Sequence, residues 1–287
     1  MHSSQNQKLE CALYVVATPI GNMRDITLRA LDILAGADTI AAEDTRNSAH
    51  LLSAHGIAAK RLLALHQHNE RGAADKVISL LAQGEAVALI TDAGTPAVSD
   101  PGALVVESVR AAGYKVIPIP GANAAVAALS AAGLATPHFL FYGFLPNKSA
   151  ARCRVLQTLI EHPYTLVFYE APHRILECVE DLQTVFGHAR EIVLAREITK
   201  LFENIHRCRL GEAMAWLNSD PNNLRGEFVL LVSAAPERAV GISAEADHVL
   251  KTLLVELPLK QAVQLAVQIT GLAKNELYQR ALEIKAE

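Results

Sequence analysis

The segment ITDAGTPAVSDPG, residues 90–102, contains two glycines, two prolines and two aspartates directly after an apolar run at 86–90. A tight turn needs only one or two such residues, so we expect a ligand to lie against this backbone. Gly94 would permit close approach, the prolines would stiffen the loop, and Asp100 would cap a helix that begins near Gly102. The segment has no lysine, and the chain has neither a GxxxxGKS/T nor a GxGxxG motif. A P-loop triphosphate site and a nicotinamide dinucleotide site are therefore disfavoured.

Four further polar segments also follow predicted strands: ATPIGNMRDIT (17–27), AEDTRNS (42–48), LHQHNER (65–71) and IPIPGANAA (117–125). Ligands of open α/β sheets bind outside the carboxyl ends of the strands. All five loops are thus expected to meet at one edge of the sheet, and this convergence is stronger evidence for a site than any single loop.

Two of these segments carry candidate chemistry. Glu43 and Asp44 are adjacent carboxylates after a strand, where they could manage a proton; the alternative is a helix cap with an ion pair to Arg46. His66 and His68 could hold a metal, but no further Cys or His cluster accompanies them. We therefore expect no metal site, and favour substrate hydrogen bonding by this segment.

The second half of the chain adds FYEAPHR (168–174), AREITKLFE (195–203) and RGEFVLLV (225–232). Together they supply cations that could bind phosphates, and carboxylates and a histidine that could move a proton. Simpler readings are a helix that starts at Pro172 and a solvated charge run after residue 195.

The elements that must position these segments alternate between strand and helix over the first 120 residues, which predicts βαβ units and a mostly parallel sheet. After Pro120-Gly121, strands are predicted at 139–144, 164–169, 192–195, 201–207 and 227–233. From the second of these strands to the last, helices are predicted only at 175–186 and 212–217, and so few crossover helices indicate a mixed sheet with antiparallel pairs. We expect a disordered N-terminus (1–11), two α/β domains (12–120 and 121–236) and a helical tail (237–287). A glycine between two amphipathic helices gives this tail a helix-turn-helix-like pattern; a helical cap on the second domain is the alternative.

Composition limits the class of protein. The 287 residues are 51% hydrophobic and 20% charged, with a net charge of −4, so any nucleic-acid binding requires a local basic patch. The four cysteines are far apart and form no CxxC motif, which predicts free thiols and a reducing, cytoplasmic location. No apolar run is long enough for a membrane span, so we expect no membrane partner.

Several motifs occur in an order that resembles a known family: LYVVATPIGNMRDITLRA, AEDTR, DAGTPAVSDPG, IPGANAAVAAL, GFLP, YEAPHR, REITK and GEFVLLV. They are similar to the tetrapyrrole-methylase-like S-adenosylmethionine methyltransferases, and most similar to a ribosomal branch that methylates the ribose 2′-hydroxyl of a cytidine in 16S rRNA. The resemblance implies a cofactor in a cleft between two α/β domains, a homodimer, and 16S rRNA or the small ribosomal subunit as partner. The commoner members carry a GxGPGD-type loop and a later GDP motif. This chain has Thr18-Pro19-Ile20-Gly21-Asn22 and Gly94-Thr95-Pro96 instead, which disfavours a tetrapyrrole substrate.

With this resemblance, the residues can be assigned expected roles. The residues expected to bind S-adenosylmethionine are Pro19, Ile20, Gly94, Thr95, Val98, Ser99, Gly121, Ala122, Asn123, Tyr169, Glu170, Ala171 and Glu227. The candidates for accepting or orienting the hydroxyl proton are Glu43, Asp44, Glu170 and His173. The residues expected to contact RNA are Arg24, Arg46, His66, His68, Asn69, Arg174, Arg196 and Lys200. Two alternatives stay open: a small-molecule, tetrapyrrole-type methyltransferase of the same fold, and a non-catalytic ribosome-binding protein.

Overall fold

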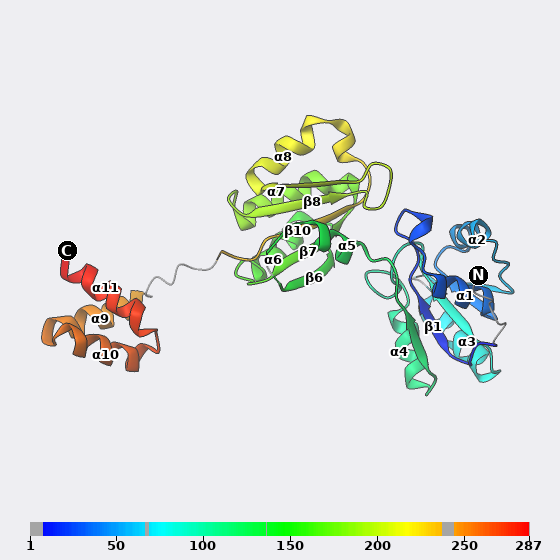
Figure 1. The fold of residues 1–287 in the computed structure, drawn as a ribbon, viewed down its shortest axis with the longest axis horizontal. Coiled ribbons are helices and arrows are strands. Elements are labelled where there is room, and N and C mark those ends of the chain that lie inside the picture. The colour runs from blue at the N-terminus through cyan, green and yellow to red at the C-terminus, as the bar shows by residue number, and fades with distance from the viewer. Residues whose placement is uncertain (1–7, 67–68, 136, 237–243, 287) are drawn as a thin grey trace. The chain divides into compact units, whose positions relative to one another are not determined.

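The computed structural model describes residues 8–66, 69–135, 137–236 and 244–286. The chain divides into two compact units, Met1–Ala234 and Ala235–Glu287. In Figure 1 the first domain of the larger unit runs from blue to cyan and green, and the second from green to yellow.

The first domain is a five-stranded, entirely parallel sheet of order β3-β2-β4-β1-β5. Its strands are β1 (Leu13–Val16), β2 (Thr39–Ala42), β3 (Leu62–Ala64), β4 (Val87–Ile90) and β5 (Val116–Ile119). The helices are α1 (Leu28–Gly36), α2 (Thr45–Ala54), α3 (Glu70–Ala82) and α4 (Ala103–Ala111), with a short η1 (Met23–Asp25). Helix α1 packs on one face of the sheet, while α3 and α4 pack on the other. Because both faces are covered, β1, β2 and β4 are apolar along most of their length.

The second domain is a mixed five-stranded sheet of order β6-β7-β10-β8-β9. Its strands are β6 (Phe139–Phe144), β7 (Thr165–Glu170), β8 (Glu191–Arg196), β9 (Asn204–Arg209) and β10 (Phe228–Val232). Only β6 and β7 are parallel; the β7–β10, β10–β8 and β8–β9 pairs are antiparallel. The prediction of a parallel sheet followed by a mixed sheet is confirmed.

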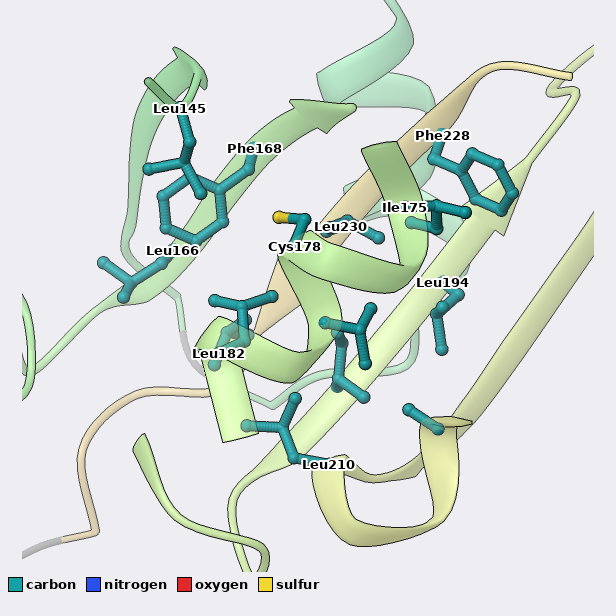
Figure 2. Close-up of a cluster of buried hydrophobic side chains, with 14 of the residues drawn as sticks. Leu145, Leu166, Phe168, Ile175, Cys178, Leu182, Leu194, Leu210, Phe228 and Leu230 are labelled. Carbon is teal, nitrogen blue, oxygen red and sulfur yellow. The ribbon is translucent and has the colours of Figure 1, made fainter. Parts of the chain in front are cut away.

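Helices cover both faces of the second sheet. Figure 2 shows α7 (Ile175–Phe186) with Cys178 and Leu182 packed against strand residues that include Phe168 and Leu230. Helices α6 (Ser149–Thr158) and α8 (Leu210–Ser219) contribute to the same core. The alanine-rich α5 (Ala124–Ala131) packs on the opposite face. Two short helices, η2 (Pro172–Arg174) and η3 (Pro221–Leu224), complete the domain.

Two local expectations were wrong. Helix α6 was not foreseen, because one of its two buried positions is Arg152 and the apolar repeat is therefore interrupted. A strand expected at 201–207 begins instead at Asn204. Leu201 and Phe202, which suggested a strand, belong to the β8–β9 turn and are 89% and 66% exposed.

The smaller unit has three helices in its described part, α9 (Ala244–Glu256), α10 (Leu259–Thr270) and α11 (Lys274–Ala286), around a small core that includes Leu250, Val263 and Leu277. Gly271 ends α10 in the left-handed conformation, with a φ of 71°. The expected helical tail is thus confirmed. No helix in the described part of the chain is long and apolar enough to cross a membrane.

Candidate functional site

A cavity of about 260 Å³ lies between the two α/β domains of the larger unit. The first domain contributes the segments that follow β1, β4 and β5, and the second contributes the ends of β6, β7 and β8 and the start of β10. Of the five first-domain loops expected to meet at this edge, 17–27, 90–102 and 117–125 line the cavity, whereas 42–48 and 65–71 do not. We call this space the first cavity.

The loop after β4 forms one wall and is held by backbone contacts. Thr18 and Gly94 exchange two backbone hydrogen bonds, of 2.8 and 3.1 Å, and Thr95 Oγ1 donates to the carbonyl of Ala122 at 3.2 Å. The φ of Gly94 is 79°, a conformation that favours glycine. The expected cap of α4 by Asp100 is wrong: the carboxylate of Glu70 accepts from the N–H of Gly102 instead. Asp100 therefore faces the first cavity.

Backbone strain occurs on both sides of the first cavity. The positive-φ residues other than glycine in the described part of the chain are Ala97 and Ser99 on one side, and Glu197 and Thr199 on the other. Non-glycine residues adopt this conformation at an energetic cost, and such residues cluster at functional sites.

The opposite wall is aromatic and acidic. The Tyr169 ring packs edge-on against Phe144, with centroids 5.7 Å apart, and its hydroxyl accepts from the N–H of Ala125 at 3.2 Å. Lys200 Nζ lies 2.8 Å from a carboxylate oxygen of Glu197 and 2.7 Å from one of Glu227. These two carboxylates keep the pKa of Lys200 above its usual value, although burial opposes the shift.

Asp100 is the residue with the most unusual electrostatics in the first cavity. Burial, followed by the negative charges of Glu43, Asp92 and Glu227, raises the pKa of Asp100 from 3.8 to about 7. A carboxyl group at this position therefore changes its charge near neutral pH, a property that often marks a functional site.

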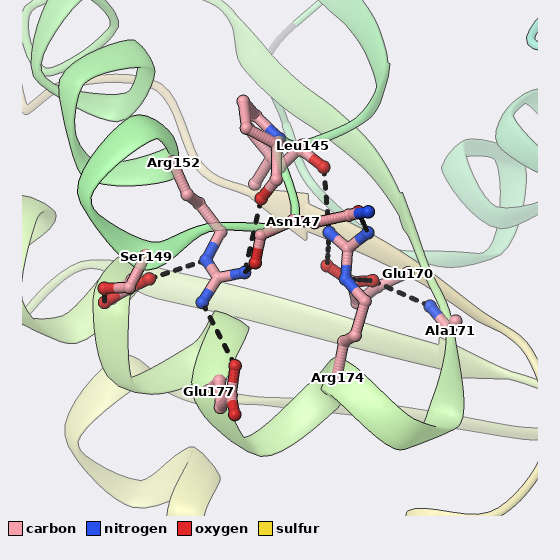
Figure 3. Close-up of polar contacts among 10 residues, drawn as sticks. Leu145, Asn147, Ser149, Arg152, Glu170, Ala171, Arg174 and Glu177 are labelled. Carbon is pink, nitrogen blue, oxygen red and sulfur yellow. Dashed lines mark hydrogen bonds and ion pairs between the residues drawn. The ribbon is translucent and has the colours of Figure 1, made fainter.

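Two arginines hold the segment that follows β6. Figure 3 shows Arg152 and Arg174 on either side of residues 145–147. Arg174 binds the buried Glu170 carboxylate through Nε at 3.0 Å and the Leu145 carbonyl through Nη2 at 2.8 Å. Arg152 is fully buried, pairs with Asp181 at 2.6 Å and donates to the carbonyls of residues 146 and 147. These contacts fix Glu170 and the adjacent wall of the cavity.

Most of the expected cofactor-binding residues line the first cavity: Ile20, Gly94, Thr95, Val98, Ser99, Asn123, Tyr169, Glu170, Ala171 and Glu227. Pro19, Gly121 and Ala122 are not among them. Gly121 is instead placed for close packing, since a Cβ there would lie 2.9 Å from the Cβ of Ala17. The residues that sequence reasoning did not assign to the cofactor are Ala93, Asp100, Ala124, Phe144, Pro172, Glu197, Ile198, Lys200, Phe228 and Val229. All ten lie inside motifs that the sequence analysis quotes, but nothing in the sequence distinguished them from the neighbouring residues that were assigned to the cofactor.

The candidate proton acceptors are placed differently from one another. Asp44 caps α2 and pairs with Arg46 at 2.7 Å, the simpler of the two readings of its sequence. Glu43 accepts weakly from the N–H of Asp92 at 3.4 Å, and burial raises its pKa. His173 is exposed in η2. Only Glu170 lines the first cavity, and Arg174 already binds it.

The residues expected to contact RNA also fall into two groups, some exposed and others bound to neighbouring groups of the protein. Arg24 and Arg46 are exposed, as is His66. Asn69 closes its own turn by accepting from the N–H of His66 at 2.8 Å, and His68 lies outside the described residues. Arg196 is only 8% exposed and donates to the Arg225 carbonyl, so it holds the chain rather than a phosphate. Arg174 and Lys200 are held in the ion pairs described above; Lys200 lines the first cavity, whereas Arg174 does not.

A second cavity, of about 340 Å³, adjoins the first. The two share Ile20, Ala93, Lys200 and Glu227 in their linings. The remaining lining residues come from the first domain: Pro19, Gly21, Met23, Asn47, His50, Leu51 and Asp92. Within the described ranges, no group of three or more His, Cys, Asp or Glu residues is arranged to hold a metal ion.

Solved methyltransferase structures share the fold of these two α/β domains. Residues 12–214 match the protein family described as Tetrapyrrole (Corrin/Porphyrin) Methylases, and the chain belongs to this family. Residues 240–285 match a second family, described as RsmI C-terminal HTH domain.

The chain is similar over nearly its whole length to proteins with one shared name. Ribosomal RNA small subunit methyltransferase I of Pseudomonas aeruginosa is 53% identical over 273 residues, which cover 94% of this chain and 96% of the relative. The protein of the same name from Escherichia coli O157:H7 is 48% identical over 271 residues, with 94% of each chain covered.

Solved structures share the fold at low sequence identity. The methyltransferase CobJ has a TM-score of 0.58 and 23% identity, covering 80% of this chain and 97% of its own. Uroporphyrin-III C-methyltransferase from Thermus thermophilus, complexed with S-adenyl homocysteine, has a TM-score of 0.55 and 16% identity, covering 77% and 97%.

Proposed function

We propose that this protein methylates the ribose 2′-hydroxyl of a cytidine in 16S rRNA of the small ribosomal subunit, with S-adenosylmethionine as methyl donor. The observation that carries the proposal is the chemistry of the first cavity. Its ionisable groups are mostly carboxylates, from Asp100, Glu170, Glu197 and Glu227, and its remaining walls are largely apolar or aromatic. Such a lining suits a cation with an attached ring system better than it suits a phosphate.

The first cavity fits S-adenosylmethionine, which has a cationic sulfonium, an ammonium group and an adenine ring but no phosphate. Asp100 would hold a positive group, and the side chains of Tyr169 and Val229 would pack against the ring system. A Cβ added to Gly94 would lie 3.5 Å from the Ile20 side chain, so the absence of a side chain keeps this wall open. The bound cofactor supplies an electrophilic methyl group.

The chain's own residues must orient the acceptor hydroxyl and take its proton. The Glu227 side chain is 77% exposed and lines both cavities, so its carboxylate can reach an acceptor next to the cofactor. Lys200 remains an ammonium because its pKa is raised, and it can therefore orient oxygen atoms but not remove a proton. We accordingly propose Glu227 as the proton acceptor, in place of Glu43, Asp44, Glu170 or His173.

The RNA substrate has separate support. The relatives named for small-subunit ribosomal RNA resemble the chain along nearly its full length, including the helical tail. Arg24 and Arg46 present exposed guanidinium groups on a chain that is acidic overall, and Arg46 is paired with Asp44, 2.7 Å away. RNA affinity should consequently decrease with added salt as counterion release becomes less favourable. We further propose that the protein acts as a homodimer in the cytoplasm.

The decisive experiment measures transfer of labelled methyl groups to 30S subunits, to naked 16S rRNA and to a tetrapyrrole, with the modified nucleotide mapped. The proposal expects a 2′-O-methylated cytidine in one of the RNA samples. Methylation of the tetrapyrrole alone, or of a base atom, would overturn it. A thermal shift assay with S-adenosylmethionine tests the remaining alternative, since a non-catalytic ribosome-binding protein would show no stabilisation.

A further inference from the structure

The second cavity contains a paired donor and acceptor that the methyl donor does not need. Asn47 Nδ2 donates to Asp92 Oδ2 at 2.9 Å, and the backbone N–H of Asp44 donates to Asp92 Oδ1 at 3.1 Å. Asp92 is therefore held against the start of α2. One N–H of the Asn47 amide and further lone pairs of the Asp92 carboxylate remain available to a ligand.

We propose that the second cavity receives the target nucleoside, turned out of the RNA strand, and that Asn47 and Asp92 together select cytosine. The proposal rests on the function proposed above and adds the specificity-determining residues. Enzymes that modify a nucleotide commonly take it out of the stack into a pocket and read the edge of its base there.

The chemistry of the pair matches cytosine. The Watson–Crick edge of cytosine presents an amino donor at N4 beside an acceptor at N3. A carboxylate accepts from N4, and an amide N–H donates to N3, so Asp92 and Asn47 satisfy both groups. Uracil reverses the pattern, with an acceptor at O4 and a donor at N3. Its O4 would face the Asp92 carboxylate, so that two acceptors would meet without a hydrogen between them.

The surroundings of the pair also suit a nucleoside. Pro19, Met23 and Leu51 give the second cavity apolar lining, and the ring of His50 offers a surface on which a base can stack. The lining shared with the first cavity includes Lys200 and Glu227. A ribose in the second cavity would therefore approach a methyl donor in the first cavity across these two residues.

Two exposed arginines are sequence neighbours of residues that line the second cavity. Arg24 follows the lining residue Met23, and Arg46 precedes Asn47. The Arg46 side chain is 89% exposed, so it can contact a phosphate beside the target nucleotide while the base is inside.

The test compares 30S subunits that carry either cytidine or uridine at the mapped position. For the wild type and the variants Asn47→Ala and Asp92→Asn, kcat/KM is measured on both subunits. The wild type should prefer cytidine, and each variant should reduce that preference about 5- to 150-fold, the range expected for one bidentate base contact. Affinity for S-adenosylmethionine, measured by calorimetry, should change less than threefold. Ser53→Ala, an exposed substitution on the same helix, should leave both quantities unchanged.

The possible results separate the two proposals. Methylation of the cytidine with no preference over uridine, or with an unchanged preference in Asn47→Ala, overturns the assignment of the pair but leaves the function intact. Equal losses on both subunits, together with weaker cofactor binding, would show that the pair only supports the fold of the site and would also overturn it. Absence of RNA methylation by the wild type would defeat both proposals.

Discussion

Replacing Asp100 with asparagine should remove a loss of stability that the native protein undergoes as the pH rises. The folded chain places this carboxyl in the wall of the first cavity, where burial and the negative charges of Glu43, Asp92 and Glu227 raise its pKa to about 7. The unfolded chain returns it to an ordinary value near 3.8. Between these values the folded state holds a proton that the unfolded state has released.

The sign follows from proton linkage. Because the folded state binds more protons in this interval, the free energy of unfolding falls as the pH rises from about 4 to about 7, and the loss is complete above pH 8. The full shift of Asp100 from 3.8 to about 7 corresponds to about 4 kcal/mol. The side chain is only partly buried, and solvent screening reduces the expected effect to about 1–2 kcal/mol.

Urea denaturation of the wild type and Asp100→Asn at pH 5, 6, 7 and 8, without cofactor, measures this effect. The variant should exceed the free energy of unfolding of the wild type by about 1–2 kcal/mol at pH 8 and by clearly less at pH 5, where only part of the linked loss has occurred. Asp32→Asn, which removes an exposed carboxylate on α1, provides the matched control and should not change the pH profile. Parallel profiles for the wild type and Asp100→Asn would refute the reasoning.

The same residue should couple cofactor binding to proton release. A cationic ligand favours the ionised carboxylate, so the wild type should release protons when it binds S-adenosylmethionine near pH 7. Calorimetry in buffers with different ionisation enthalpies detects this release, which should be smaller in Asp100→Asn. Equal release from both proteins would show that the positive groups of the cofactor lie away from Asp100.

Three further substitutions test other parts of the site. Glu227→Gln should lower the rate of methyl transfer about 100-fold or more, while cofactor affinity measured by calorimetry falls much less; parallel losses would contradict its role with the proton. Arg152→Ala should destabilise the protein to urea by about 3–5 kcal/mol, because it leaves a buried carboxylate without its partner. Gly143→Ala should lower the free energy of unfolding by more than backbone strain alone, because the new Cβ would lie 2.6 Å from Ser99 Oγ. Gly187→Ala is the matched control, since Gly187 has a similar φ and no neighbour within 4 Å of the added Cβ. Equal urea midpoints for the two variants would argue against this contact.

The architecture of the larger unit could be predicted well from the sequence because its elements are defined locally. Apolar runs such as 87–90 and helices that end at a glycine, as before Gly84, can be recognised without knowledge of their neighbours. Helix α6 shows where this approach fails. Its buried Arg152 is stabilised by Asp181, which lies 29 positions later in the chain. No local sequence pattern predicts such a pair.

In the candidate site, too, features defined by local sequence could be predicted and features that depend on distant residues could not. The loop at 90–102 could be identified as part of a site because it follows a strand and the carboxyl ends of parallel strands share an edge. The segments around Tyr169 and Glu227 lie in the other domain and were assigned to the same site only through the family resemblance. The wrong assignment of Asp100 as a helix cap arose from its position shortly before Gly102. Glu70, at the start of another helix, accepts that hydrogen bond instead, and only the packing of α3 beside α4 brings it there.

The sequence by itself determined the order of the strands and of most helices, the class of sheet in each domain and the main first-domain loops of the site, since each depends on residues close together in the chain. The tertiary structure decided which charged groups are available. Arg174 and Arg196 became internal supports and Asp100 a cavity carboxylate with a pKa near neutrality, while Lys200 and Glu227 came to lie in the linings of two cavities. These outcomes depend on burial and on partners from distant segments, because electrostatic energies follow distance in space and exclusion of water rather than position in the chain.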